Sequence, residues 1–323
     1  MAERAMILVV SYPEEEHTDA VCAELAQAGR EVVRINLADF PSRAGVAATW
    51  RNGRAPSFRL ELEQGSVDIS DTRAVWWRRV RSFEPDARIA GADRRHFAVS
   101  ETTQAVYGML DALRCPWINP RQADDAAHHK PYQWSLAQAA GLHVPRTLVT
   151  SQPSVARDFI ADMGERRVVF KAFLASIEDW RETRLVEAED VARLDLVRLA
   201  PVIFQEYIAG VDLRITIIGN QLFAAEIDAR HSSYPIDMRM VIDEGRIRAV
   251  ELPDHVSRRL LDLQRRLGLV YGAVDMRRSD DGEYHFLEVN PAGQWLFVEQ
   301  RTGLPITRAH AKLLSTLADE AVT

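Results

Sequence analysis

The sequence predicts an α/β protein built from three consecutive parts. In the first part, short apolar segments alternate with segments of helical periodicity, which is typical of a parallel sheet flanked by helices. Two proline-containing breaks, Asn119-Pro120 and Ala200-Pro201, divide the remainder, and strand patterns dominate after the second break. We therefore expect an N-terminal α/β domain, a central α/β subdomain and a C-terminal α+β subdomain, over residues 1–119, 120–200 and 201–323.

Composition and charge exclude several classes of protein. The chain has 323 residues, of which 47% are hydrophobic and 27% charged, and its net charge is −7. An acidic chain without a long basic block is a poor candidate for binding nucleic acid or an anionic membrane. No apolar run approaches the ~20 residues of a membrane span, and two distant cysteines make no disulfide framework. We expect a cytoplasmic protein with neither nucleic-acid nor membrane partners.

Apolar periodicity and turn residues place the individual elements. For the first part we expect strands at 6–10, 31–35 and 74–77, helices at 17–28 and 93–113, and a hairpin at 47–62 around Asn52-Gly53. For the central part we expect helices at 121–140, interrupted near Pro131, and at 153–163, with strands at 146–149 and 168–171. For the last part we expect strands at 202–208, 211–218, 222–229 and 239–242, and helices at 253–267 and 307–318.

A second predicted hairpin carries most of the chemical information. Asp281-Gly282 separates two alternating runs, and this dipeptide is the strongest short signal for a two-residue hairpin turn. In the resulting register Asp280 lies opposite Glu283, and Asp275 lies opposite Glu288. Carboxylates that face each other directly destabilise a sheet unless a cation compensates them.

The charged face of this hairpin predicts a metal site. Asn290 lies two residues beyond Glu288 and therefore on the same face as Glu288 and Asp275. Two carboxylates and an amide oxygen suit Mg²⁺, which completes its octahedron with water and nucleotide phosphates. The alternative is an exposed acidic hairpin whose charges are simply solvated. The opposite face of the hairpin is expected to be core, with Met276, Leu287 and Val289.

Lysine is rare in this chain. Only Lys130, Lys171 and Lys312 are lysines among the 40 basic residues, a bias that a GC-rich gene would explain. An ammonium is a compact point charge, whereas a guanidinium is a planar fork, so the two are not interchangeable in a binding site. The positions that retain lysine are therefore candidates for binding a ligand.

Asp275 and the run Glu288-Val-Asn290-Pro291 resemble the C-terminal magnesium motif of ATP-grasp ligases. Lys130 and Lys171 occupy the places of the two lysines that bind nucleotide phosphates in that family. The resemblance implies an ATP-grasp fold of three subdomains, with a pre-ATP-grasp domain first. It also implies that ATP and Mg²⁺ are bound between the central and C-terminal subdomains.

The same resemblance assigns roles to residues between these motifs. It implies that adenine is held by Gln205, Glu206, Tyr207 and Ile208, and that Asp212 faces the ribose. It further implies that Arg214 and Arg230 act on the reacting phosphate together with Lys171.

Within ATP-grasp ligases, the chain is most similar to graspetide synthetases, the microviridin-type ligases that modify ribosomal peptides. The residues that carry this similarity are Val75-Trp76-Trp77-Arg78-Arg79 and the segment 290–306. The resemblance implies that Asp or Glu side chains of a precursor peptide are activated as acyl phosphates. Thr or Ser hydroxyls, or a Lys amine, would then attack them to give esters or an amide, with release of ADP and phosphate. It also implies recognition of a leader peptide and is compatible with a homodimer.

Three arginines are candidates for contacting the peptide. Arg78 and Arg79 follow a predicted strand, and ligands of parallel sheets bind at such strand ends, although both side chains could equally be solvated. Arg184 ends the segment 172–184, which contains no glycine, whereas many ATP-grasp enzymes have a glycine-rich phosphate lid there.

Two other functions remain open at this level. One is a ligase that adds free amino acids, such as glutamate, to a peptide or small acid. The other, of a different class, is a nucleotide-binding protein without catalysis. A product that has lost water without gaining mass would indicate crosslinking, and a gain of whole amino acids would indicate the first alternative.

Overall fold

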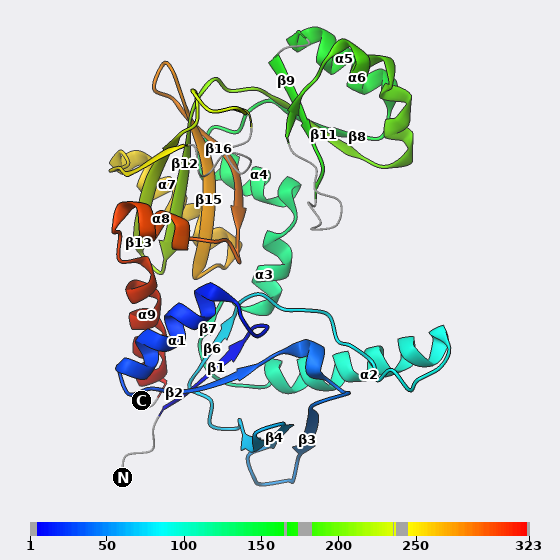
Figure 1. The fold of residues 1–323 in the computed structure, drawn as a ribbon, viewed down its shortest axis with the longest axis vertical. Helices are drawn as coiled ribbons and strands as arrows, with labels where there is room; N and C mark the ends of the chain where they lie inside the picture. Colours follow the sequence, from blue (N-terminus) through cyan, green and yellow to red (C-terminus); the bar gives the residue numbers. More distant parts are fainter. Residues whose placement is uncertain (1–4, 165–166, 174–182, 235, 237–244, 322–323) are drawn as a thin grey trace. The chain divides into compact units, whose positions relative to one another are not determined.

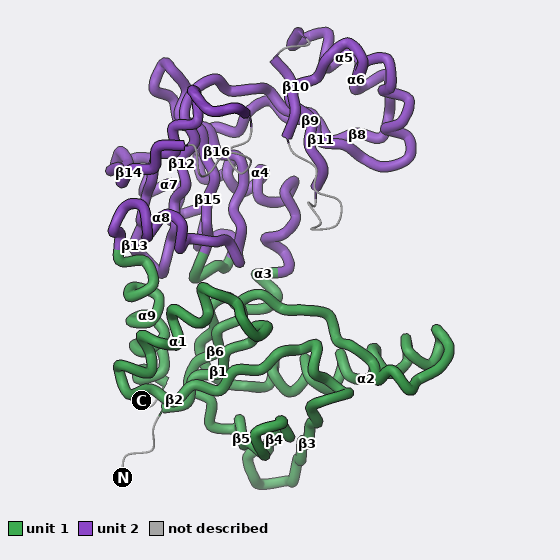
Figure 2. Tube along the Cα trace, viewed as in Figure 1, with its two compact units in different colours: residues 1–124, 268–271, 305–323 green, residues 125–267, 272–304 purple. Residues whose placement is uncertain are grey.

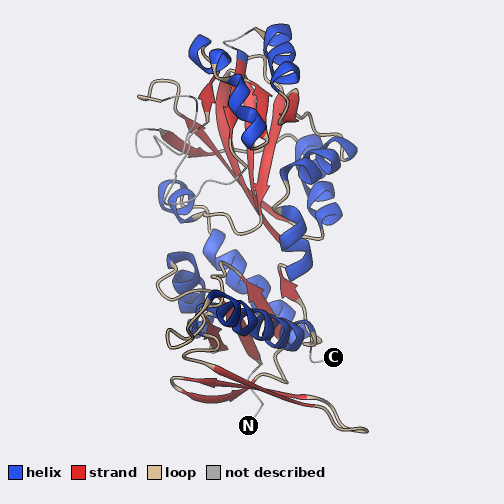
Figure 3. Ribbon diagram, turned by 90° about the vertical axis from the view of Figure 1, so that its right-hand side faces the viewer, coloured by secondary structure: helices blue, strands red, loops and turns tan. Residues whose placement is uncertain are grey.

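The computed structural model describes residues 5–164, 167–173, 183–234, 236 and 245–321. The chain divides into two compact units, each containing separate stretches of sequence (Figures 1 and 2). The first unit comprises residues 1–124, 268–271 and 305–323, and the second comprises residues 125–267 and 272–304. Helices flank the sheets in both units (Figure 3).

The first unit is built on a parallel sheet with strand order β2-β1-β6-β7. Its central strand, β1, is buried along its whole length, as expected for a strand covered on both faces. The elements of this sheet and its helices are β1 (Met6–Val10), α1 (Glu16–Gln27), β2 (Glu31–Ile35), β6 (Ala74–Trp77), α2 (Ala92–Asp111) and β7 (Trp117–Ile118). The predicted strand–helix alternation is therefore confirmed.

Two further pieces complete the first unit. The predicted hairpin is part of an antiparallel sheet of β3 (Gly45–Thr49), β4 (Ser57–Leu62) and β5 (Gly65–Asp68). The helix α9 (Ile306–Glu320), although it comes from the far end of the chain, packs on α1, β1 and β6. Asp319 in α9 accepts two hydrogen bonds of 2.6 Å from Arg30, which follows α1.

The second unit begins in α3 (Arg121–Ala127) and continues into α4 (Lys130–Ala139), with the break near Pro131 that the sequence predicts. An antiparallel sheet of order β10-β9-β11-β8 follows. Its elements are β8 (Thr147–Thr150), α5 (Pro153–Met163), β9 (Val168–Lys171), β10 (Arg184–Leu185), α6 (Ala188–Ala192), the 3₁₀ helix at Leu194–Leu199 and β11 (Val202–Glu206). Apolar side chains of α5, including Ala156 and Ile160, pack against Val168 and Phe204 of the sheet.

A larger sheet of order β14-β13-β12-β15-β16 completes the second unit. Its strands are β12 (Gly210–Ile218), β13 (Gln221–Asp228), β14 (Arg246–Ala249), β15 (Tyr271–Ser279) and β16 (Tyr284–Asn290). The helix α4 packs against β16 and α7 (Asp254–Leu267), and α8 (Leu296–Thr302), which the sequence pattern did not reveal, contacts β14. The strand predicted at 239–242 lies outside the described residues.

The β15–β16 hairpin differs from its predicted register near the turn. The turn contains three residues, 280–282, because the N–H of Ser279 donates to the carbonyl of Glu283 and Gly282 adopts a φ of +90°. This is the three-residue loop with a left-handed glycine, so the expected pairing of Asp280 with Glu283 is wrong.

Further along the same hairpin the predicted register is restored. A β-bulge between Asp275 and Met276 leaves Leu287 unpaired, so Met276 pairs with Phe286 while Asp275 pairs with Glu288, as expected. The bulge also changes the direction of Leu287, which lines a pocket instead of the core. Met276 and Val289 are buried, as predicted.

Candidate functional site

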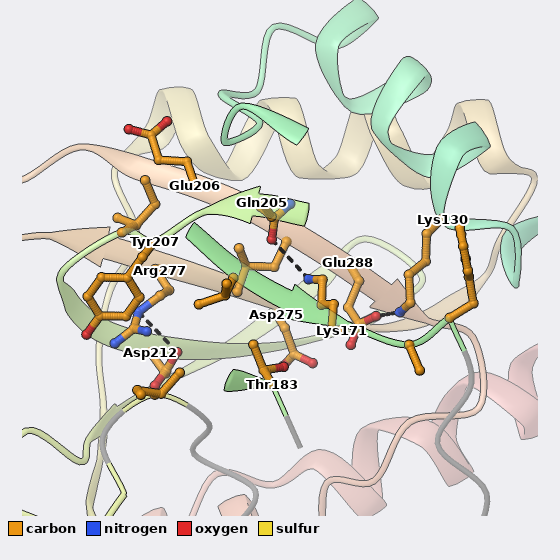
Figure 4. Close-up of a pocket in the computed structure, with 16 residues that line it drawn as sticks. Lys130, Lys171, Thr183, Gln205, Glu206, Tyr207, Asp212, Asp275, Arg277 and Glu288 are labelled. Atoms are coloured by element: carbon orange, nitrogen blue, oxygen red, sulfur yellow. Dashed lines mark hydrogen bonds and ion pairs between the residues drawn. The ribbon is translucent and has the colours of Figure 1, made fainter. Parts of the chain in front are cut away.

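A pocket in the second unit collects most of the predicted site residues (Figure 4). Its walls come from the start of α4, the strands β9 and β11, the segment between β11 and β12, and the β15–β16 hairpin. The residues that line it are Lys130, Val169, Lys171, Ala172, Phe173, Thr183, Gln205, Glu206, Tyr207, Ile208, Asp212, Ile236, Asp275, Arg277, Leu287 and Glu288. Nine of the predicted nucleotide and metal residues are therefore brought together within one cavity.

The two opposed carboxylates lie at one end of this pocket, and each has a cation as partner. Lys130, the first residue of α4, forms an ion pair with Glu288. Nη1 of Arg214, on β12, donates to Oδ1 of Asp275 at 2.7 Å. Nη2 of Arg214 also donates to the carbonyl of Gln294 at 3.1 Å, which fixes the direction of the guanidinium. These pairings offset the repulsion expected between carboxylates on neighbouring strands.

The donor set at this end fits a magnesium ion. Asp275 and Glu288 present carboxylate oxygens to the pocket from directly paired positions, and hard oxygen ligands of this kind are what Mg²⁺ takes. Both side chains keep some solvent access, with exposed fractions of 17% and 25%. Among the described residues, no group of three or more His, Cys, Asp or Glu side chains gathers as a metal cluster, so the protein offers a partial shell. Phosphate oxygens and water would complete such a shell.

Lys171 projects into the middle of the pocket from the end of β9, where a chain of hydrogen bonds holds it. Its Nζ donates to Oε1 of Gln205 at 3.0 Å, and Nε2 of Gln205 donates to Oγ1 of Thr147 at 2.8 Å. The Thr147 hydroxyl in turn donates to the carbonyl of Pro145 at 2.7 Å. Because that proton is committed to Pro145, the hydroxyl accepts from the Gln205 amide, which leaves Oε1 facing Lys171.

The opposite end of the pocket is formed by the segment that joins β11 to β12. Glu206, Tyr207 and Ile208 all line the cavity. The N–H of Glu206 donates to the carbonyl of Arg146 at 2.8 Å, and the N–H of Tyr207 donates to the carbonyl of Arg167. These backbone bonds fix a short stretch of main chain at the pocket wall, which is the kind of surface that recognises the edge of a planar base.

Asp212 and Arg277 lie beside this segment, one on β12 and the other on β15. The carboxylate of Asp212 and the guanidinium of Arg277 form an ion pair with 3.5 Å between Oδ1 and Nε. Both residues are buried, and both line the pocket. In Figure 4 they lie near Tyr207 and away from the Lys130–Glu288 pair.

Besides Arg214 and the two arginines that follow β6, three predicted residues do not line the pocket, namely Asn290, Arg230 and Arg184. Asn290 ends β16 in an exposed position, where its Oδ1 accepts a hydrogen bond of 2.9 Å from the N–H of Ala292. The side chain of Arg230 forms two hydrogen bonds with Asp228, which lower the pKa of that carboxyl to about 2 and raise the pKa of Arg230. Arg184 lies over the ring of Phe170, with its Cζ 4.9 Å from the ring centroid. Most of the segment 172–184 lies outside the described residues. The roles expected for these three residues remain predictions.

The two arginines that follow β6 differ from each other. Arg78 is only 2% exposed, and its Nη2 lies 3.5 Å from Oε1 of Glu15 inside the first unit. Its guanidinium also lies over the ring of Tyr271, so it is not presented at the surface as the strand-end position suggested. Arg79 is half-buried and retains a side chain within reach of solvent.

Seven of the residues that line the pocket were not among the predicted site residues, and Arg277 and Leu287 are two of them. Arg277 lies two residues from Asp275 on the same strand, so the period of two in β-strands could have placed it on the ligand-facing side. Leu287 lines the pocket only because of the β-bulge, and no signal in the sequence locates a bulge at that position.

The fold and this pocket together define an ATP-dependent ligase of the ATP-grasp class. Residues 127–315 match the family model described as a RimK-like ATP-grasp domain, and residues 6–125 match the model of an MvdD pre-ATP grasp domain. The chain therefore belongs to the RimK-like ATP-grasp family, and the fold expected from the sequence is confirmed.

The similarity of this chain to solved structures extends over nearly its whole length. A RiPP-associated ATP-grasp ligase of Chryseobacterium gregarium, in complex with ADP and a leader and core peptide, is 27% identical with a TM-score of 0.86, covering 96% of both chains. The macrocyclase MdnC of Microcystis aeruginosa, bound with the precursor peptide MdnA, is 26% identical with a TM-score of 0.83, covering 96% of this chain and 99% of MdnC. The ATP-grasp ligase PsnB, complexed with minimal precursor, Mg and ADP, is 26% identical with a TM-score of 0.79, covering 98% and 99%. A search among curated proteins found no match.

Proposed function

We propose that this enzyme crosslinks side chains of a ribosomally made precursor peptide at the expense of ATP. The observation that carries this proposal is the extent of the similarity. A RimK-like domain alone is compatible with several ligase reactions, whereas the similarity to peptide-modifying ligases and macrocyclases includes the first unit as well.

The proposed reaction has two steps. The γ-phosphoryl group of ATP is transferred to an Asp or Glu side chain of the peptide, giving an acyl phosphate and ADP. A Thr or Ser hydroxyl, or a Lys amine, of the same peptide then attacks the acyl carbon, and phosphate leaves with formation of an ester or amide. Because both reacting groups belong to one bound peptide, the second step benefits from proximity.

The pocket residues supply charge and position to the first step. Transfer of a phosphoryl group requires alignment and neutralisation of negative charge rather than a nucleophile from the protein. In this proposal Lys130 and Lys171, which line the pocket, bind phosphate oxygens, and Arg214, which is hydrogen-bonded to Asp275, stabilises the charge that develops there. Asp275 and Glu288, with Asn290 as a further proposed ligand, would hold Mg²⁺, which polarises phosphoryl oxygens when it is bound.

The proposed contacts with the peptide are made by arginine side chains. Arg79 and Arg184 remain the proposed partners for acidic side chains, since a guanidinium binds a carboxylate through two parallel hydrogen bonds. We assign no direct contact to Arg78, because its guanidinium is enclosed with Glu15.

We also propose a cytoplasmic location, because the reaction consumes ATP and begins with a newly made peptide. None of the helices in the described part of the chain has the length and apolarity that a bilayer span requires. A homodimer remains a prediction.

Mass spectrometry of a reconstituted reaction tests the proposed function. The purified enzyme would be incubated with ATP, Mg²⁺ and a Thr- and Asp/Glu-rich peptide encoded beside its gene. We expect the peptide to lose one water for each bond formed, with one ADP released per bond. A gain of whole amino acids from added glutamate would contradict crosslinking, and ATP binding without ADP release would indicate a non-catalytic protein.

A further inference from the structure

Arg277 contacts three points of the segment 207–212, which comprises the connection from β11 to β12 and the start of β12. Its Nη2 donates to the carbonyl of Gly210 at 3.1 Å, and its Cζ lies 5.3 Å from the centroid of the Tyr207 ring. Its Nε lies 3.5 Å from Oδ1 of Asp212. One buried guanidinium therefore links the start, the middle and the end of the segment 207–212 to β15.

The backbone of this segment is independently constrained at the same place. Gly210 has a φ of +145°, and a Cβ added there would lie 2.1 Å from the carbonyl oxygen of Arg278. No side chain fits such a contact, so the segment passes directly against β15. The close approach brings the carbonyl of Gly210 within reach of Arg277, and it limits the positions open to Asp212 two residues later.

The charge of Arg277 determines what Asp212 can do in the pocket. A carboxylate that is buried without a cation is strongly disfavoured and takes up a proton instead. Asp212 is 8% exposed, and the adjacent guanidinium stabilises its ionised form. An ionised carboxylate only accepts hydrogen bonds, so it matches ligand groups that donate them, such as the hydroxyls of a sugar.

The position of the pair indicates which hydroxyls these are. The Asp212–Arg277 pair lies beside Tyr207, on the side of the pocket away from Lys130 and Glu288 (Figure 4). A nucleotide bound with its base at the β11–β12 segment and its phosphates at the lysines has its sugar between these ends. The resemblance to ATP-grasp ligases implies that Asp212 faces this sugar.

We propose that Arg277 is a positioning residue that makes the pocket selective for ribonucleotides over deoxyribonucleotides. It holds the Asp212 carboxylate ionised and directed toward the sugar hydroxyls, and it ties Gly210 and Tyr207 to the same strand. This inference rests on the proposed use of ATP and adds the residue that sets selectivity for the sugar.

Equilibrium binding by titration calorimetry tests the proposal without turnover. ATP and 2′-deoxyATP would be titrated into the wild type, Arg277→Gln and Arg278→Gln. Arg278 is a matched control, because it is the next residue on β15 but pairs with Glu226 and does not line the pocket. We expect the wild type and Arg278→Gln to prefer ATP. In Arg277→Gln we expect the affinity for ATP to fall about tenfold and that for 2′-deoxyATP to change less than about twofold, as for loss of one charged hydrogen bond.

A second measurement uses the protein without nucleotide. Hydrogen exchange of the backbone amides at 207–212 should become faster in Arg277→Gln and remain unchanged in Arg278→Gln. Arg277→Lys keeps the positive charge but loses the planar guanidinium with its several N–H donors. It should therefore retain part of the ATP preference that Arg277→Gln loses. This variant, together with Asp212→Asn, keeps the test valid if Arg277→Gln does not fold.

The outcomes separate this inference from the proposed function. Equal losses of affinity for both nucleotides in Arg277→Gln, or an unaltered preference for ATP in that variant and in Arg277→Lys, would overturn the role of Arg277. A wild type that binds both nucleotides equally would also overturn it. A wild type that binds no nucleotide would instead overturn the proposed function.

Discussion

Ion pairs in the two units differ in their access to solvent. In the pocket of the second unit, the side chains of Lys130 and Glu288 are 16% and 25% exposed. In the first unit, the side chains of Arg78 and Glu15 are 1% and 2% exposed. The pocket pair can exchange partners when a ligand enters, whereas the interior pair is shielded from solvent and ligands. We infer that the pocket charges serve binding and the interior charges serve the fold.

The interior pair belongs to a small polar cluster that its neighbours satisfy. Glu15 caps α1 by accepting a hydrogen bond of 2.8 Å from the N–H of Thr18, and it also contacts Nδ1 of His17 at 3.1 Å. Burial alone would favour the neutral acid, but the hydrogen bond with His17 and the charge of Arg78 outweigh it. The pKa of Glu15 is therefore well below its ordinary value.

Removing one pocket carboxylate should have the largest effect on activity. We expect Glu288→Gln to lower kcat by about a thousandfold, because the loss of metal-binding charge removes several kcal/mol of transition-state stabilisation. The free energy of unfolding should change little. Glu283→Gln, an exposed acid on the same hairpin, is the matched control. ADP release at the wild-type rate by Glu288→Gln would contradict this role for the pocket pair.

Removing the interior cation, Arg78, should lower stability more than it lowers ATP binding. We expect Arg78→Met to destabilise the protein by about 3–5 kcal/mol, since it leaves the Glu15 carboxylate buried without its charge partner. Chemical denaturation measures this loss, and the half-buried Arg79→Met should lose much less. If the folded fraction of Arg78→Met binds ATP as the wild type does, the structural role is supported. A normal stability would refute it.

Stability should also fall in acid because of a buried histidine. His310 in α9 is fully buried beside the rings of Trp76 and Tyr271, and burial lowers its pKa from 6.5 to about 3. The unfolded chain therefore binds more protons between these values, so stability is complete above about pH 6.5 and declines as the pH falls.

Denaturation curves at several pH values check this expectation. One such histidine contributes up to about 1.4 kcal/mol per pH unit below its unfolded pKa. His17, whose pKa burial also lowers, acts in the same direction. His310→Phe should show a shallower loss of stability with acid than the wild type. If stability falls equally with pH in the two proteins, His310 is not a source of the acid sensitivity.

The smallest effect concerns the hydrogen bonds behind Lys171. We expect Thr147→Val to weaken ATP binding about fivefold, since it removes one hydrogen bond worth about 1 kcal/mol and frees the Gln205 amide to rotate. Thr147→Ser keeps the hydroxyl and should bind ATP normally. Calorimetry distinguishes the two variants, and equal affinities would show that Gln205 does not depend on Thr147.

The sequence predicted those parts of the site that depend on local pattern. The Asp275–Glu288 pairing follows from strand alternation, and the two lysines stand out by their rarity. The bulge at Leu287 and the burial of Arg78 against Glu15 depend on contacts between residues that are separated in the sequence. An arginine after a strand looks the same in sequence whether its charge partner is a ligand or a carboxylate of the protein.

The helix α9 has a consequence for synthesis of the chain. Most of the first unit is formed by residues 1–124. The unit remains incomplete until α9, which packs on α1, β1 and β6, has been synthesised. At about 5–20 residues per second, the ribosome needs roughly 10–35 s to make the intervening residues. During that interval the apolar surface that α9 covers is exposed, so we expect a nascent chain stalled before residue 305 to recruit chaperones that a chain extended beyond α9 no longer needs.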